Sequence, residues 1–302
     1  MAEAARGSPE GGSPPRRRLF GTLREIASET WQYRQLTYQL ALRDVRIRYK
    51  QAVMGFAWAI LMPGLIVLAG ALVRYAMAYV SGSDVNGGEI AGMAVKAVPW
   101  AFFVGAIGFA TTSLTGNAQL VGKVYFPREA LPLASVLAQS FDSTVGSIAL
   151  LLALPLMGVA YSFGILLWIP LLAALLFAFT LGTALLLSCA NLFFRDVKYI
   201  VQVLLTFGIF FTPVFFEPAM FGPLGAQIMM LNPLAPLLEG FRLAVVEGHN
   251  LLQPLTVVSG RGAEVIAWSP EYLLYAAASA VGALTVGALV FHRFEFVFAE
   301  YV

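Results

Sequence analysis

A stretch with the residue types of a phosphate-binding loop lies at residues 116–123, GNAQLVGK. The backbone amides of such a loop hold nucleotide phosphates, and a Ser or Thr directly after its lysine holds Mg²⁺. Here five residues, where the motif has four, separate the two glycines, and Val124 follows Lys123. The stretch therefore does not predict a nucleotide site.

Other combinations of residues that carry out chemistry are missing from the sequence. It contains no HExxH, no GxSxG and no Asp-rich metal motif. The two histidines, His249 and His292, have no paired ligand at a useful spacing, and the single cysteine, Cys189, lies in an apolar run where packing is its expected role. We therefore expect no catalytic residue, metal or cofactor in this chain.

The composition is that of an integral membrane protein. Hydrophobic residues make up 59% of the chain and charged residues 12%, and the mean hydropathy is +0.77, whereas an average soluble domain is about 25% charged. A net charge of +2 gives no reason to expect a nucleic-acid partner. Ionisable residues near the apolar stretches, Arg74, Asp142 and Glu217, lie close to their ends, so an ion-driven carrier is not expected. If the protein moves a substrate, its energy comes from another chain.

Six apolar stretches are long enough, or nearly so, to cross about 30 Å of hydrocarbon. The fifth is short and has Pro213 near its end, which favours a kinked or re-entrant segment. We predict an all-α membrane protein whose six spans lie at residues 56–79, 98–116, 136–160, 166–191, 200–216 and 272–291.

The basic residues predict the orientation of these spans. Of the 19 Lys and Arg residues, ten precede Met54 and five more fall in segments on the same side of the membrane. Because Lys and Arg favour the cytoplasmic side, both termini are expected inside. No apolar run of a cleaved signal precedes Arg16, Arg17 and Arg18. We divide the chain into a disordered basic tail (1–22), an amphipathic helix (23–52) and a six-span domain (53–302).

The amphipathic helix joins the first span without a linker. Within residues 36–50, apolar ridges lie on two opposite sides of the helix, and Arg43, Arg46 and Lys50 lie between them. Such a helix is suited to the headgroup layer, with one ridge against lipid and the other against protein. It is either a plain anchor for the first span or a docking surface for a partner.

A second candidate surface lies between the second and third spans. Residues 117–135 combine an apolar face with Lys123 and the pair Arg128 and Glu129, and Pro127 and Pro132 close the segment. A short helix lying parallel to the membrane surface here would transmit a movement of a bound partner to the second and third spans. The alternative is an ordinary capped turn.

The longest loop, residues 217–270, is expected on the outer side. In it, Asn232 and Pro233 have the pattern of an N-cap and a first helical residue. We place the short helix that follows across the outer mouth of the bundle, and we expect Leu237, Leu238 and Phe241 to be covered there.

Five motifs then occur in the order typical of one family: LALRDVRIRYKQAVMGFAWAILMP, KVYFPREALPLAS, NLFFRDVKYIVQ, FFTPVFF and NPLAPLLEGFR. From residue 36 onward, the chain resembles the permease subunit of type-2 ABC exporters for polysaccharides and teichoic acids. A longer amino-terminal tail and an extended outer insert at residues 251–267 depart from the family pattern.

The resemblance implies a homodimer of six-span permeases, each docked on a separate ATP-binding cassette subunit that holds ATP and Mg²⁺. The exporter would move a lipid-linked polysaccharide of the O-antigen type, carried on undecaprenyl, across the bacterial inner membrane. Residues 36–50 would form an interface helix, 117–126 a coupling helix in a groove of the ATPase, and 232–246 part of an outer gate.

The resemblance also implies roles for single residues. The interface-helix residues are Arg43, Asp44, Arg46, Arg48 and Tyr49. The ATPase-coupling residues are Asn117, Leu120, Lys123, Phe126, Pro127, Arg128 and Glu129. Arg195 and Asp196 of the next inner loop would brace the dimer, and the outer gate would use Asn232, Pro233, Glu239 and Arg242.

Aromatic residues are expected to line a glycan path, because their faces offer sugar C–H groups weak, repeated contacts. The candidates are Tyr75, Tyr79, Phe102, Phe103, Phe207, Phe210, Phe211, Phe215 and Phe216. The alternative is that they contact lipid or line the membrane interface. Alternative functions are the export of teichoic acid, another glycolipid or a drug, an intramembrane enzyme acting on a lipid-linked sugar, and a passive scramblase or channel.

Overall fold

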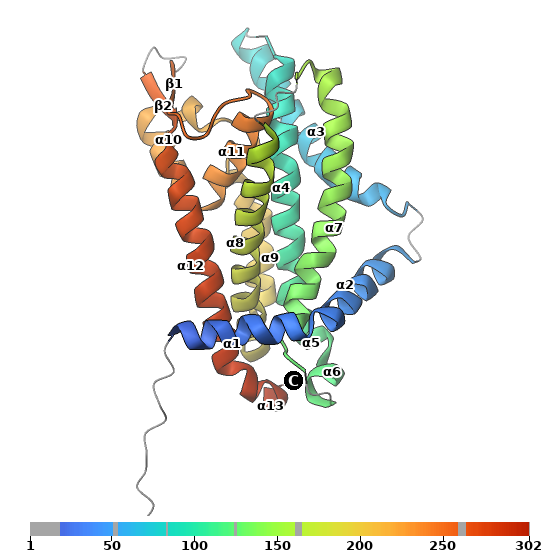
Figure 1. The fold of residues 1–302 in the computed structure, drawn as a ribbon. Helices are drawn as coiled ribbons and strands as arrows, with labels where there is room; N and C mark the ends of the chain where they lie inside the picture. Colours follow the sequence, from blue (N-terminus) through green and yellow to red (C-terminus); the bar gives the residue numbers. More distant parts are fainter. Residues whose placement is uncertain are drawn as a thin grey trace, which may run out of the picture.

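The computed structural model describes residues 19–50, 54–82, 84–123, 126–160, 165–258 and 264–301. The tail prediction for residues 1–18, with Arg16, Arg17 and Arg18, lies outside the described residues. Figure 1 shows a bundle of long helices with a helix lying across one of its ends. We call that end the α6 end, where α1 (Leu19–Gln32), α6 (Ala118–Lys123) and α13 (Phe298–Tyr301) lie.

In the described part of the chain, five helices are long and apolar enough to cross a membrane. α7 is continued by η1 (Leu154–Met157), and α12 is continued by η4 (Glu295–Val297). The five helices are α3 (Ala57–Ser81), α4 (Gly87–Thr111), α7 (Ala130–Ala153), α8 (Ile165–Phe193) and α12 (Pro270–Phe294).

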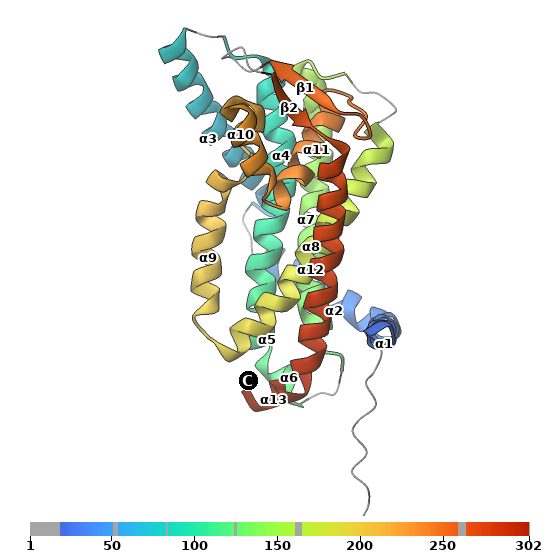
Figure 2. The same ribbon diagram turned by 90° about the vertical axis from the view of Figure 1, so that its left-hand side faces the viewer.

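The predicted fifth span is a shorter element. α9 (Val197–Gly208) and η2 (Ile209–Phe211) together form an apolar helix over Val197–Phe211, which at about 1.5 Å per residue is shorter than the hydrocarbon core. The helix ends because Thr212 is extended (φ −123°, ψ 137°), the conformation favoured before a proline such as Pro213. Figure 2 shows α9 on the flank of the bundle, below α10 (Gly222–Met230).

α4 is the centre of the bundle. In its most apolar window, 78% of the residues are buried, against 6% for α3. The core cluster around α4 includes Phe102, Ile107, Val136 and Leu172. α3 therefore presents most of its surface outward, and α4 is the element around which α7, α8 and α11 (Leu234–Val245) pack.

α4 also starts eleven residues before the predicted second span. Its first turn is capped by the Asn86 side chain, which accepts a hydrogen bond from Gly88 N at 3.3 Å. The prediction began at Val98 because Lys96 and Glu89 interrupt the apolar run. In the structure Lys96 is instead inside the helix and 1% exposed.

The amphipathic region forms two helices. α1 begins four residues before the predicted boundary at residue 23, and Tyr33 separates it from α2 (Arg34–Tyr49). Leu40 and Ala41 on α2 are buried against a second core cluster at the α6 end, which includes Leu131 and Phe291. α2 thus packs on the bundle, with α7 as its main neighbour.

The opposite end, which we call the hairpin end, contains two β-strands. The prediction of an all-α protein was therefore wrong at this end. Within the outer insert, β1 (Leu255–Val258) pairs antiparallel with β2 (Glu264–Trp268). β-Branched residues on both strands favour this pairing. The hairpin packs on η3 (Pro218–Phe221) and α10, and Trp268 Nε1 donates a hydrogen bond to Leu251 O at 2.9 Å.

Candidate functional site

α2 is fixed to α7 by a charged residue buried in the bundle. Asp142 on α7 is 6% exposed and forms an ion pair with Arg48. Tyr49 Oη donates a hydrogen bond to Asp142 Oδ1 at 2.6 Å. Burial and this hydrogen bond raise the pKa of Tyr49, so the phenol stays neutral and remains a donor.

Arg48 extends the same contact to two further groups. Its guanidinium donates a hydrogen bond to Gln139 Oε1 at 3.0 Å and lies over the Phe109 ring of α4, 4.1 Å from the centroid. A guanidinium over an aromatic face is attractive as well as rigidly oriented. The end of α2 is therefore held by both α7 and α4.

A second contact joins α2 to the start of α6. Arg43 Nη2 donates hydrogen bonds to Asp44 Oδ1 at 2.8 Å and to Asn117 Oδ1 at 3.0 Å. Asn117 lies between α5 (Ser113–Gly116) and α6, and its Nδ2 donates to Ser113 O at 2.9 Å. Two segments predicted separately, residues 36–50 and 117–126, thus meet directly.

α6 is a short helix with one buried side. Val121 is 1% exposed and Phe126, just after α6, is 8% exposed, and both belong to the core cluster at the α6 end. Leu120 packs partly buried against the same cluster, whereas Lys123 is exposed. α6 is therefore fixed to the bundle on one side and presents a cation on the other.

Arg128 and Glu129 lie away from this exposed side. Arg128 donates hydrogen bonds to Val121 O, at 3.4 Å, and to Glu295 O, which connects α6 with η4. Glu129 is 6% exposed and faces His292. Pro127 between α6 and α7 is half-buried. The structure therefore brings the predicted coupling residues together but turns Glu129 inward.

The other site residues that were predicted on the inner side are exposed. Arg46 on α2, and Arg195 and Asp196 between α8 and α9, all lie on the surface. The Asn191 side chain caps this turn by accepting a hydrogen bond from Lys198 N at 3.1 Å. The turn presents Arg195 and Asp196 outward.

At the hairpin end, α11 is buried over its whole length. Leu237 and Leu238 are 0% exposed and Phe241 is 9% exposed. The three side chains are therefore buried, as we expected from the sequence. Asn232 Oδ1 accepts a hydrogen bond from Leu234 N at 3.1 Å, and Asn232 Nδ2 donates one to Thr212 Oγ1 at 3.0 Å. Asn232 thus bonds the first residue of α11 and joins the helix to the end of the α9 segment, whereas Pro233, predicted as the first helical residue, occupies the N-cap position.

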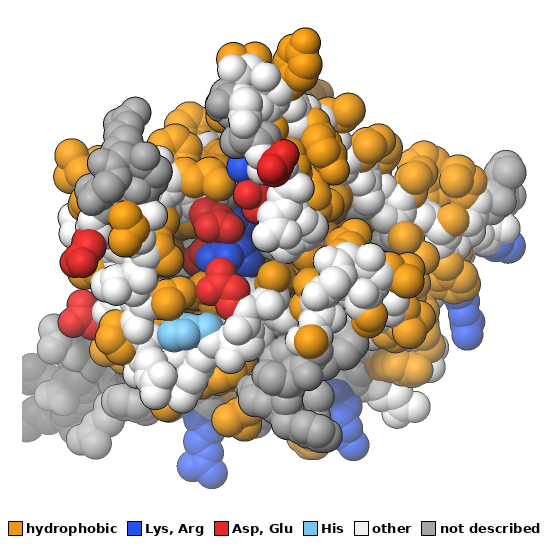
Figure 3. All heavy atoms as spheres, turned by 90° about the horizontal axis from the view of Figure 1, so that it is seen from above, with side chains coloured by type: hydrophobic (Ala, Val, Ile, Leu, Met, Phe, Trp, Pro, Cys, Tyr) orange, Lys and Arg blue, Asp and Glu red, His pale blue; other side chains and the backbone are white. Residues whose placement is uncertain are grey.

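Charged side chains gather beneath the hairpin end, in the hollow that Figure 3 shows from above. Arg242 donates to Glu239 Oε1 at 2.8 Å and to Glu247 Oε1 at 2.6 Å, and its Nη1 lies 3.2 Å from Glu217 Oε1. Lys96 Nζ donates to Phe216 O at 2.8 Å and lies 3.7 Å from Glu239. We call Lys96, Glu217, Glu239, Arg242 and Glu247 the hairpin-end charge cluster.

Within the hairpin-end charge cluster, the pKa values of Glu217 and Glu239 are shifted in opposite directions. Burial raises the pKa of Glu217, and the positive charge of Arg242 offsets only part of this increase. Burial would also raise the pKa of Glu239, but the charges of Arg242 and Lys96 outweigh it and hold that pKa below its usual value. Glu239 is therefore the carboxylate that the buried cations stabilise.

Comparison with known proteins agrees with this architecture. Residues 35–246 match the family model described as ABC-2 type transporter. The chain belongs to the ABC-2 type transporter family. It is a multi-pass permease component of such a transporter and not an enzyme, and ABC-2 permeases pair with ATP-binding subunits.

The permease is also similar to proteins named O-antigen export system permease protein RfbA. It is 30% identical over 232 residues to the protein of Myxococcus xanthus, covering 75% of this chain and 85% of the relative. Two relatives from Klebsiella pneumoniae are 26% and 27% identical over 206 residues, covering 68% of this chain and 78% of each relative.

The aromatic residues predicted to line a glycan path fall into two groups, one buried or half-buried and one exposed. Phe102 and Phe103 are buried in the core around α4, and Phe215 and Phe216 are half-buried. The remaining aromatic candidates are exposed on α3, α9 and η2: Tyr75, Tyr79, Phe207, Phe210 and Phe211. A contact with an external polymer is therefore open to this second group.

Two features of the permease were missed by sequence reasoning. Lys96 is one of the four Lys and Arg residues outside the segments expected on the inner side, and its place in a buried helix had no sequence signal. His292 was expected to have no paired ligand, yet its Nδ1 lies 3.1 Å from Glu295 and 3.6 Å from Glu129. The spacing of His292 and Glu295, three residues apart on a helix, was the available signal, whereas Glu129 is far away in the sequence.

Proposed function

We propose that this permease exports a lipid-linked polysaccharide of the O-antigen type, carried on undecaprenyl, across the bacterial inner membrane. The observation that carries this proposal is the similarity to the O-antigen export permease of Myxococcus xanthus, which extends over 85% of that protein. ATP would be hydrolysed by two copies of a separate ATP-binding subunit, with Mg²⁺ bound there. Two copies of this chain would form the transport path.

The α6 end would face the cytoplasm, with both termini on that side. The basic residues of α2 and the exposed Lys123 on α6 lie there, which agrees with the preference of such residues for the cytoplasmic side. A sixth crossing would be completed by α9, η2 and the non-helical residues that follow, shielded from lipid by neighbouring protein.

The work of the ATP-binding subunits would enter through α6. Closure of the two subunits on ATP would shift the exposed side of α6 around Lys123, and the buried Val121 would carry the shift into the bundle. The bond between Arg43 and Asn117 would move α2 at the same time. Because Arg48 holds α2 to α7 and α4, both helices would respond together.

The exposed faces of α3 and α9 would line the path between the two copies. α3 leaves most of its apolar surface uncovered within one chain, and α3, α9 and η2 carry the exposed aromatic residues. Arg195 and Asp196 would brace the two copies near the α6 end. At the other end, α11 with Asn232, Pro233, Glu239 and Arg242 would act as the outer gate.

Deletion of the gene in its host tests the proposed substrate. We expect surface polysaccharide to be lost while undecaprenyl-linked polymer accumulates on the cytoplasmic side, and the wild-type gene should restore export. Unchanged surface polysaccharide would contradict the proposal. Loss of a polyol-phosphate polymer would indicate teichoic acid export, and a change in drug resistance alone would indicate a drug exporter.

A further inference from the structure

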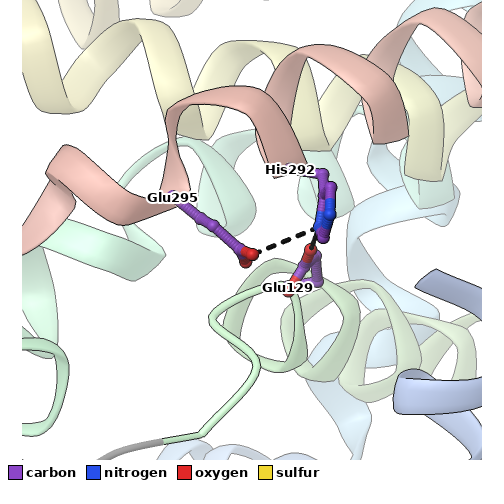
Figure 4. A group of neighbouring side chains, drawn as sticks. All are labelled: Glu129, His292 and Glu295. Atoms are coloured by element: carbon purple, nitrogen blue, oxygen red, sulfur yellow. Dashed lines mark ion pairs between the residues drawn. The ribbon is translucent and has the colours of Figure 1, made fainter. Parts of the chain in front are cut away.

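Three ionisable side chains meet at the α6 end, as Figure 4 shows. Glu129 precedes α7, His292 lies in the last turn of α12, and Glu295 begins η4. One ligand atom from each residue lies within 4.8 Å of the other two. The group therefore joins the segment after α6 to the carboxyl-terminal end of the last long helix.

The spacing of the ligand atoms fits a first-row divalent cation. His292 Nδ1 lies 3.1 Å from Glu295 Oε1 and 3.6 Å from Glu129 Oε1. Neighbouring atoms bound about 2.0–2.2 Å from Zn²⁺ lie roughly 2.8–3.6 Å from one another in octahedral or tetrahedral geometry. One imidazole nitrogen with two carboxylate oxygens is also a donor set that such cations accept.

The buried carboxylate of Glu129 faces His292 at 3.6 Å but takes no hydrogen bond from it. Its side chain is 8% exposed and points toward His292 and Glu295. Within the part of the chain that the structure describes, neither of its oxygens accepts a hydrogen bond, and His292 Nδ1 is also without one. Buried carboxylates are normally hydrogen-bonded, paired or bound to a metal ion.

The nearby side chain of Arg128 does not supply the missing hydrogen bonds to Glu129. The guanidinium of Arg128 bonds the backbone carbonyls of Val121 and Glu295 and not the carboxylate oxygens that face His292. A polar pocket of about 530 Å³ adjoins the group and is lined by His292, Glu295, Glu29 of α1 and Tyr33, which follows α1. A hydrated cation therefore has a route to the site.

We propose that Glu129, His292 and Glu295 bind a divalent cation of the Zn²⁺ type, with water in the remaining positions. The cation would fasten the end of α12 to the segment between α6 and α7. Arg128 connects the same two regions through hydrogen bonds. Cation binding would therefore stiffen the support of α6 whatever substrate the permease carries.

The test measures metal binding by the full-length chain alone, in lipid nanodiscs and without a histidine tag. Wild-type protein loaded with Zn²⁺ and desalted should retain one Zn²⁺ per chain by mass spectrometry. X-ray absorption at the zinc edge should show only nitrogen and oxygen neighbours. Because no transport is measured, this proposal and the proposed export function can fail independently.

Three variants locate the site. Glu129→Gln, which keeps the side-chain shape, and His292→Gln should each weaken Zn²⁺ binding by about tenfold or more, since even residues that only support a ligand have effects of this size. His249→Ala, which changes a half-buried histidine at the hairpin end whose Nε2 lies 3.0 Å from Gln253 O, should bind like wild type. Thermal melting without metal shows whether each variant folds.

Three results would overturn the proposal. One is wild-type protein that retains no stoichiometric Zn²⁺, which would mean that the two carboxyl groups share a proton instead. Another is undiminished binding by Glu129→Gln and His292→Gln. The third is a sulfur neighbour at the zinc edge, which would place the ion at Cys189.

Discussion

Arg43 Nη2 donates a hydrogen bond to Asn117 Oδ1 at 3.0 Å, although the two residues are 74 positions apart in the sequence. This bond joins α2 to the start of α6. Because Asn117 also bonds back to Ser113 O, the contact reaches the end of the α4–α5 segment. α2 and α6 are therefore positioned as one unit at the α6 end.

Removal of either partner should weaken the coupling of ATP hydrolysis to export. Arg43→Ala and Asn117→Ala should each lower the polymer exported per ATP. The double variant should be no worse than the more damaged single one, because both remove the same bond. Arg34→Ala is the matched control, since Arg34 is an exposed arginine on the same helix and lies outside the interface-helix residues. Additive losses in the double variant would contradict a direct link.

The ion pair of Arg48 with Asp142 should contribute to stability. Asp142→Asn leaves the Arg48 charge without its partner and should destabilise the protein by about 1–3 kcal/mol. Tyr49→Phe removes one hydrogen bond and should cost about 1 kcal/mol. Thermal melting in detergent measures both. Asp84→Asn, at an exposed position, is the control, and equal melting temperatures for Asp142→Asn and Asp84→Asn would refute the assignment.

Close contact between α8 and α12 depends on glycine. A Cβ atom at Gly182 would clash with backbone atoms of Ala283 and Leu284, whereas a Cβ atom at Gly282 meets nothing within 4 Å. Gly182→Ala should therefore push the helices apart and cost about 1–3 kcal/mol. Gly282→Ala should be neutral or slightly stabilising. Similar melting temperatures for the two variants would show that the helices separate without cost.

The hairpin-end charge cluster predicts a loss of stability in acid. The folded-state pKa of Glu239 is below its usual value of 4.5 because of Arg242 and Lys96. Its ion pairs therefore contribute stability that is present above pH 4.5 and lost as the pH falls through the folded-state pKa. Glu239→Gln should lack this acid loss in melting experiments.

Glu217 should behave in the opposite way. Burial raises its pKa, so protonation of Glu217 as the pH falls favours the folded state. Glu217→Gln should therefore retain the acid loss of stability that Glu239 causes. Identical pH profiles for the Glu217 and Glu239 variants would contradict the assignment.

Sequence patterns predicted the features that depend on local periodicity. The amphipathic α2, the short α6 with Val121 buried, and the α11 helix after Asn232 follow from apolar spacing and capping residues. The start of α4 was missed because Lys96 looks like the end of a span in a hydropathy profile. The charge of Lys96 is paired with Glu239, which lies on a helix more than a hundred residues later in the sequence. No local sequence pattern shows this pairing.

The side-chain groups depend on pairings between distant segments. The sequence suggests that Glu129 pairs with Arg128. In the structure, the packing of α12 against α8 places His292 and Glu295 beside Glu129 instead. The hairpin in the outer insert was also missed, because two short strands separated by a loop give a weak signal beside long apolar helices.

Reconstitution in liposomes tests the central claim most directly, namely that the energy for transport enters this permease from a separate ATP-binding subunit. Lipid-linked polysaccharide should move uphill only when the permease is combined with its active ATP-binding partner and ATP. A partner unable to hydrolyse ATP should give no uphill movement. Uphill movement of the glycolipid by the permease alone would contradict the account.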